Sequence, residues 1–103
     1  VLQPDVCMLG GLTEARRAVA MVEEAGKVPA PHTPFVGPAA LASLHLLATA
    51  QEENYFAAIE PAGGRDMYGT GIARWQASID VPSGPGLGAD PDPAFLRAHD
   101  CAR

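Results

Sequence analysis

Apolar and polar positions in the first part of the chain predict a strand followed by a helix. The opening "VLQPDVCMLGG" is an apolar run interrupted by Pro4 and Asp5 and closed by two glycines, which is typical of a buried strand ending in a loop. Apolar residues then recur at helical spacing between Ala15 and Ala25, and Gly26 predicts the end of this helix. Thr13 is the expected N-cap residue, because its side chain can accept a hydrogen bond from the first turn.

The same alternation continues with a second strand and a second helix. Residues 27–31 form a short, partly apolar run bounded by prolines, which predicts a strand ending at His32. Pro38 suits the first turn of a helix that runs through "AALASLHLLATA". This helix is apolar on nearly every side and needs cover all round, and we expect a chain of 103 residues to provide too little of it.

A third strand completes the predicted pattern, and a different composition follows it. The run "YFAAIE" is typical of a strand, and it ends at Glu60 without a turn signal for a hairpin. Such long connections imply parallel pairing with right-handed crossovers, so the predicted fold class is α/β. Beyond Pro61 glycines and prolines dominate, with one further candidate strand at residues 73–81. We therefore expect the strands and helices in residues 1–60 and a loop-rich tail in residues 61–103.

Charge and composition exclude several classes of function. The formal net charge is -5 and the basic residues form no cluster beyond one adjacent pair, which argues against nucleic acid as a partner. The longest apolar stretch, residues 39–50, is too short to span a bilayer, so no membrane partner is expected. Cys7 and Cys101 form no CxxC motif, which favours reduced thiols and a cytoplasmic protein but leaves a disulfide between them open.

Three ionisable residues stand at the ends of the three predicted strands: Asp5, His32 and Glu60. The carboxyl ends of parallel strands lie at one edge of the sheet, where loops form a common crevice. His32 can exchange a proton near neutral pH, and Asp5 could accept its other N–H and fix the tautomer, so the pair is the candidate acid/base unit. Glu60 could donate a hydrogen bond to a developing oxyanion if it stays protonated, or act as a ligand or anchor if it is ionised.

Each of these residues also has a simpler interpretation. A histidine after "PAP" is often a loop residue bonded to backbone, and an aspartate after proline is often a turn residue or helix cap. Glu60 before Pro61 could be a solvated strand end. The repeated position at strand ends is what favours the functional interpretation.

The same residues carry a resemblance to a known family. The segment "LQPDVCMLGGLTEARRAVAMVEEAGKVPAPHTPF" resembles the sixth and seventh barrel-strand region of the enolase superfamily, specifically its mandelate racemase/muconate lactonizing enzyme family. "YFAAIE" resembles the eighth strand, and "VPSGPGLGADPDPAFL" resembles the C-terminal tail that returns to the capping domain. The resemblance covers nearly the whole chain and rests mainly on the series "QPD...GG.TEA...A...G...PH".

The resemblance implies the C-terminal part of a modified TIM barrel, (β/α)7β, with about three parallel strands and two helices here and a tail packing toward a capping domain. It also implies Mg2+ as cofactor and removal of the proton α to a carboxylate. By position, Asp5 and His32 match the aspartate and histidine of the acid/base dyad. Glu60 matches the glutamate that hydrogen-bonds the substrate carboxylate as it becomes an enolate.

Several parts of the family pattern have no counterpart in this chain. The Lys-x-Lys pair of the second strand, the three carboxylates that bind Mg2+ and the capping domain are all missing, so no metal ligand is predicted here and the ligands are expected upstream. Without the metal the α-proton of a carboxylate is too weakly acidic for His32 to remove at a useful rate. We expect the 103-residue chain to be the C-terminal third of a longer enzyme and inactive alone.

The resemblance favours an acid-sugar dehydratase, with a small carboxylate or sugar acid as substrate and a homo-oligomer as the full-length form. One alternative is a racemase or epimerase of a 2-hydroxy acid in the same family. Another is a non-catalytic remnant or interaction protein that associates through its apolar helix.

Overall fold

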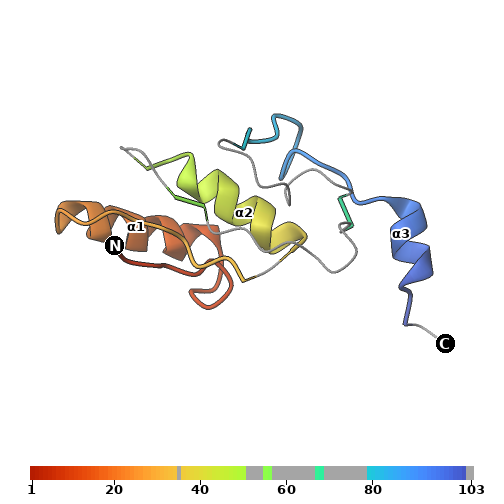
Figure 1. Cartoon of the computed structure of the whole chain (residues 1–103), viewed down its shortest axis with the longest axis horizontal. Coiled ribbons are helices and arrows are strands. Elements are labelled where there is room, and N and C mark those ends of the chain that lie inside the picture. Colours follow the sequence, from red (N-terminus) through yellow and green to blue (C-terminus); the bar gives the residue numbers. More distant parts are fainter. Residues whose placement is uncertain (35, 51–54, 57–66, 69–78, 102–103) are drawn as a thin grey trace.

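The computed structural model describes residues 1–34, 36–50, 55–56, 67–68 and 79–101, and three helices lie in these ranges. They are α1 (Leu12–Glu24), α2 (Pro38–Leu47) and α3 (Pro93–Ala98). Helices α1 and α2 contact each other, whereas α3 lies apart from them at one end of the molecule (Figure 1). No helix in the described part of the chain is long and apolar enough to cross a lipid bilayer.

Helix α1 confirms the first predicted helix and corrects its N-terminus. The N-cap residue is Gly11, not Thr13, and no side chain caps this end. At the other end Gly26 has φ +65°, and the N–H groups of Gly26 and Lys27 donate to the carbonyls of Glu23 and Val22. This pair of bonds is a Schellman motif, which ends the helix as the glycine predicted.

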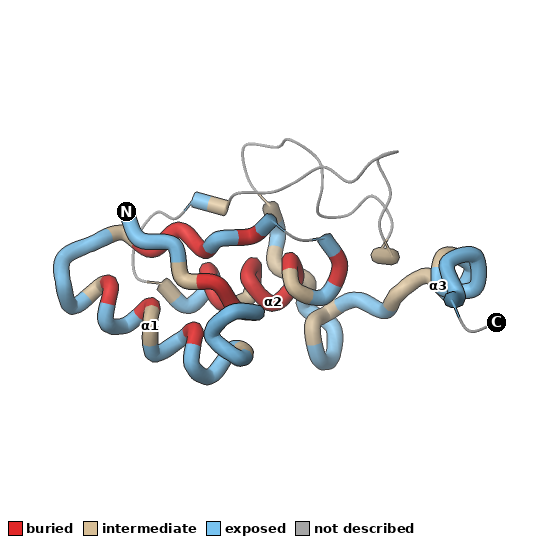
Figure 2. The backbone as a smooth tube through the Cα atoms, turned by 90° about the horizontal axis from the view of Figure 1, so that it is seen from below, coloured by how far each residue is buried: buried red, intermediate tan, exposed pale blue. Residues whose placement is uncertain are grey.

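Helix α2 confirms the second predicted helix, with Pro38 in its first turn. Every residue from Ala40 to Leu47 is buried except His45. The expectation that this chain gives the apolar helix too little cover is therefore wrong. Figure 2 shows buried residues on α2, along one side of α1 and on the extended segments beside these helices.

The core joins these two helices to the loop after the first predicted strand. Val6, Ala15, Val19, Ala42 and Leu46 form one buried cluster. The C-terminal segment closes over it, because Leu87 packs against the cluster and its carbonyl oxygen accepts a hydrogen bond of 3.0 Å from His45 Nε2. Residues far apart in sequence thus share one small core.

The first two predicted strands lie side by side and parallel, but neither is a regular strand. An isolated parallel bridge joins Leu2 to Pro29. Leu2 N–H donates to the Val28 carbonyl at 3.0 Å, and Ala30 N–H donates to the Leu2 carbonyl at 2.8 Å. Proline has no N–H to donate, so the prolines in both segments limit how far the ladder can extend.

The tail contains a helix that the sequence pattern did not predict. Helix α3 has Asp92 as its N-cap, and the Asp92 carboxylate accepts a hydrogen bond of 2.8 Å from Ala94 N–H. The expectation of a loop-rich tail did not include this helix, which is six residues long. Of the third predicted strand only Tyr55 and Phe56 are described, and they are in neither a helix nor a strand. Most of the candidate strand at 73–81 also lies outside the described residues.

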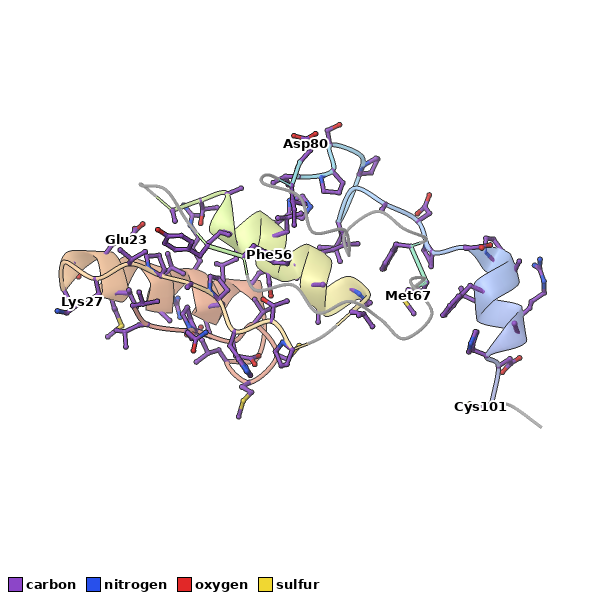
Figure 3. All side chains as sticks on the ribbon, in the orientation of Figure 1. Glu23, Lys27, Phe56, Met67, Asp80 and Cys101 are labelled. Atoms are coloured by element: carbon purple, nitrogen blue, oxygen red, sulfur yellow. The ribbon has the colours of Figure 1, made fainter. Side chains whose placement is uncertain are left out.

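Both cysteines are free and exposed. Cys101 follows α3, at the opposite end of the molecule from Lys27 (Figure 3). Cys7 lies near the other end of the chain, two residues after Asp5. The structure therefore contains no disulfide between them.

Gly88 packs closely against Pro82 in the tail, and a substitution of Gly88 can test this contact. Gly88 has φ +81°, and a Cβ atom added there would lie 2.5 Å from both the Cβ and the carbonyl oxygen of Pro82. A Gly88→Ala variant should therefore lose the turn, since it combines a left-handed backbone penalty of roughly 1–2 kcal/mol with a clash against backbone. Limited proteolysis should cut this segment markedly faster than in the wild type.

Gly86→Ala is the matched control for this variant. Gly86 also has a positive φ, +66°, but a Cβ atom there would meet nothing within 4 Å. It should therefore suffer only the backbone penalty and resist proteolysis better than Gly88→Ala. Equal cleavage rates in the two variants would show that Gly88 does not approach Pro82 closely.

Candidate active site

Asp5 anchors the loop that follows the first bridged segment. Its Oδ1 accepts hydrogen bonds from the backbone N–H groups of Cys7, at 2.8 Å, and Met8, at 3.0 Å. Leu9 N–H donates to the Asp5 carbonyl at 3.0 Å, and Gly11 N–H donates to the Val6 carbonyl at 2.8 Å. This is the behaviour expected of an aspartate that organises a turn through its side chain.

His32 is brought to Asp5 by the parallel pairing of the two segments. The backbone N–H of His32 donates to the Pro4 carbonyl at 3.0 Å, which continues the bonding of the Leu2–Pro29 bridge. His32 Nδ1 lies 2.9 Å from Asp5 Oδ2. The two side chains are 27 residues apart in sequence. Asp5 and His32 lie at the same end of the two parallel segments, and their side chains are hydrogen-bonded to each other.

The environments of the two side chains differ. Only 7% of the Asp5 side chain is exposed, against 49% of the His32 side chain. Three hydrogen bonds hold the pKa of Asp5 below its usual value: the Met8 N–H contributes most, His32 next, and Cys7 less, while burial acts in the opposite direction. The carboxylate is therefore ionised near neutral pH and can only accept hydrogen bonds.

This geometry fixes the proton on one side of the imidazole ring. Because ionised Asp5 accepts, His32 Nδ1 must be the donor, and in the neutral ring Nε2 then holds the lone pair. A histidine held in this tautomer by a buried carboxylate, with half of its side chain exposed, can take up and release a proton at Nε2. The arrangement is chemically suited to general acid/base work.

The structure brings together two of the three predicted site residues. Asp5 and His32 are hydrogen-bonded to each other, and Glu60 lies outside the described residues. The simpler interpretation of Asp5 as a turn residue also holds, because its second oxygen organises the loop. Sequence reasoning missed the two backbone N–H groups of Cys7 and Met8, although an aspartate directly after a proline is a recognised signal for such a turn.

No metal centre is formed by the residues that the structure describes. Among them there is no group of three or more histidine, cysteine, aspartate or glutamate side chains that could hold a metal ion. The Asp5 and His32 pair therefore does not fit a Mg2+ site by itself, since Mg2+ takes oxygen ligands in near-octahedral geometry.

A concavity on α1 is separate from this pair. Its lining residues are Leu12, Thr13, Arg16, Arg17 and Ala20. Arg17 also forms a 2.6 Å ion pair with Glu14, and both side chains are more than half exposed. Neither Asp5 nor His32 lines this concavity.

A histidine and aspartate pair at the end of two parallel segments, each followed by a helix, is the arrangement expected of α/β proteins, whose sites lie at the carboxyl ends of parallel strands. Residues 1–95 match the enolase C-terminal domain-like family, and the chain belongs to that family. It corresponds to the C-terminal portion of enolase superfamily proteins, whose α/β fold is of the TIM-barrel type.

One curated relative gives a more specific similarity. The chain is 32% identical over 92 residues to a D-gluconate dehydratase from Thermoproteus tenax. The aligned region covers 85% of this chain. The match spans only 18% of that relative's length. No solved structure matches the chain significantly.

Proposed function

We propose that this chain is the C-terminal part of a Mg2+-dependent acid-sugar dehydratase in which His32 is the general acid/base and Asp5 orients it. The 2.9 Å hydrogen bond between His32 Nδ1 and Asp5 Oδ2 is the observation that carries the proposal. The similarity to a D-gluconate dehydratase supports dehydration of a sugar acid as the reaction and gluconate-like acids as the first substrates to test.

In the proposed reaction His32 moves a proton at the carbon next to the substrate carboxylate. Its Nε2 accepts the proton, and the C–H electron pair moves into the carboxylate to give an enolate. The hydroxyl on the neighbouring carbon takes up a proton and leaves as water. The resulting enol then becomes a 2-keto-3-deoxy acid, so no external oxidant or reductant is needed.

Asp5 supports this chemistry without touching the substrate. As an ionised carboxylate it stabilises the imidazolium that forms when His32 takes up the proton. Its bonds to the Cys7 and Met8 N–H groups hold the carboxylate while the charge on His32 changes. Glu60 is proposed to hydrogen-bond the carboxylate of the substrate as negative charge develops there.

Mg2+ is the usual cofactor of the superfamily. The described residues offer no metal-binding group, so we place its ligands outside them, and no step above is assigned to the metal. We also propose that the remaining barrel strands and the capping domain, which determine the substrate, belong to the longer protein.

The test uses the protein made from the complete coding sequence. It is incubated in D2O with D-gluconate and a panel of other sugar acids, with Mg2+ and again after treatment with a chelator. Proton NMR should show a 2-keto-3-deoxy product from at least one acid with Mg2+, and the chelator should abolish its formation.

The same spectra distinguish the alternatives. Exchange of the α-proton for deuterium without loss of water would indicate a racemase or epimerase and would overturn the dehydratase proposal. No exchange and no product with any acid would favour a non-catalytic remnant.

A further inference from the structure

His32 is the half-exposed residue between two buried neighbours. Pro31 and Thr33 are both among the fully buried side chains of the molecule, with 2% of Thr33 exposed, while 49% of the His32 side chain is exposed. The residues on each side of His32 are thus held inside the protein, while half of the His32 side chain reaches the surface. The direction in which it does so depends on the peptide groups next to it.

The peptide group that joins Pro31 to His32 is hydrogen-bonded at both ends. Its N–H, that of His32, donates to the Pro4 carbonyl at 3.0 Å. Its carbonyl, that of Pro31, accepts a hydrogen bond of 3.1 Å from Thr33 Oγ1. The first bond holds the plane of this peptide group, and the second closes a ring that contains both backbone torsions of His32. Together they restrict the direction of the bond from Cα to Cβ of His32.

Thr33 donates a hydrogen bond to the Pro31 carbonyl, which the segment of Leu2 and Pro4 does not reach. Successive backbone groups along an extended segment point to opposite sides, and Val28, Ala30 and His32 direct theirs to the segment of Leu2 and Pro4. The Pro31 carbonyl therefore faces away from that segment. The Thr33 hydroxyl reaches it from two residues further along the chain.

We propose that Thr33 is a positioning residue for His32, which it holds through the Pro31 carbonyl so that Nδ1 meets Asp5 and Nε2 faces the reacting carbon. This inference rests on the proposed function for its effect on catalysis. Its structural part, the orientation of the imidazole against Asp5, can be measured without substrate. A threonine that only satisfies its own buried hydroxyl would leave that orientation unchanged.

Three variants in the complete protein test the inference. Thr33→Val keeps the volume and removes the hydroxyl, Thr33→Ser keeps the hydroxyl, and Thr13→Val makes the same change as the first at an exposed threonine of α1. Thr33→Val should lower kcat by roughly 10- to 100-fold with KM changed by less than about 3-fold, because displacement of a reacting group slows chemistry more than binding. Thr33→Ser should recover most of kcat, and Thr13→Val should resemble the wild type.

A second measurement separates this inference from the proposed function. The 15N NMR signals of the His32 ring, recorded without substrate, should shift in Thr33→Val and return to wild-type positions in Thr33→Ser. These shifts are expected even if no sugar acid is a substrate. Unchanged ring signals in Thr33→Val, or a Thr33→Ser variant as impaired as Thr33→Val, would overturn the positioning role. If Thr33→Val does not fold, the positioning role is judged on Thr33→Ser alone. That variant must then show wild-type ring signals and a wild-type kcat, and any other result overturns the role.

Discussion

His32→Asn should reduce the rate of α-proton removal, and with it the rate of dehydration, in the complete protein by roughly 10²–10⁴-fold, the usual contribution of a positioned acid/base group. Asparagine can still donate a hydrogen bond to Asp5, but its amide cannot take up a proton at neutral pH. The measurement is the rate at which the best sugar-acid substrate forms its 2-keto-3-deoxy product, followed by proton NMR. Mg2+ binding, followed by calorimetry, should be unaffected because the described residues around His32 form no metal group.

The matched control for this variant is His99→Asn. His99 is exposed at the C-terminus of α3, where its Nδ1 lies 2.8 Å from the Phe95 carbonyl and its ring stacks on Phe95. It is a second histidine with a local partner but outside the Asp5 pair, so its replacement should leave the rate of product formation unchanged. Product formation at the wild-type rate in His32→Asn would remove the acid/base role from His32.

The pairing of Asp5 with His32 could be predicted because it depends on two local patterns and one rule of topology. Each residue ends an apolar segment, and parallel segments joined by a helix place their carboxyl ends together. The observed bonds between the segments agree with parallel pairing, and they leave both side chains at the same end. A one-residue change of register would have turned one side chain to the opposite face.

The helix boundaries show where local signals are reliable. Gly26 predicted the end of α1, because a left-handed residue is needed there and glycine adopts that conformation without strain. The capping side chain of Thr13 predicts a start two residues too late, because backbone geometry and not a capping side chain begins this helix. Gly11 occupies the N-cap with φ 119°, and the loop organised by Asp5 determines where the helix begins.

Other features depended on contacts that no local pattern contains. The cover of α2 comes partly from Leu87, whose carbonyl is bound by His45, 42 residues away in sequence. Helix α3 is six residues long, too short for a helical period to stand out, and its start is marked only by Asp92 and Pro93. The hydrogen bond of the Thr33 hydroxyl could not be predicted from the sequence, because its acceptor is a backbone carbonyl, which every residue carries.

Asp5→Asn is expected to destabilise the protein by about 1.5–3 kcal/mol near pH 5, the usual range for hydrogen bonds made by a charged group. The amide oxygen can still accept from the Cys7 and Met8 N–H groups, so the loop should keep its shape. What is lost is the ionised carboxylate that those donors and His32 stabilise. Thermal unfolding of the complete protein by calorimetry measures the difference between the variant and the wild type.

The pH dependence of that difference identifies its cause. Folding holds the pKa of Asp5 below its ordinary value, so the unfolded chain takes up a proton at a higher pH than the folded protein does. The stabilisation is therefore fully present above the unfolded pKa, and it is lost as the pH falls through the lower folded pKa. The gap between wild type and Asp5→Asn should narrow between about pH 4 and pH 2, where the unfolded carboxylate titrates.

A control aspartate separates this effect from the general loss of charge in acid. Asp90 is exposed in the tail, and Asp90→Asn removes the same charge at a site far along the chain from the His32 pair. Its difference from the wild type should be small at pH 5, since exposed charges contribute little to stability. If the Asp5→Asn gap stays constant from pH 5 to pH 2, the destabilisation comes from altered packing or hydrogen-bond geometry. The bonds from Met8, His32 and Cys7 would then not stabilise Asp5 as a carboxylate, and the fixed tautomer of His32 would lose its basis.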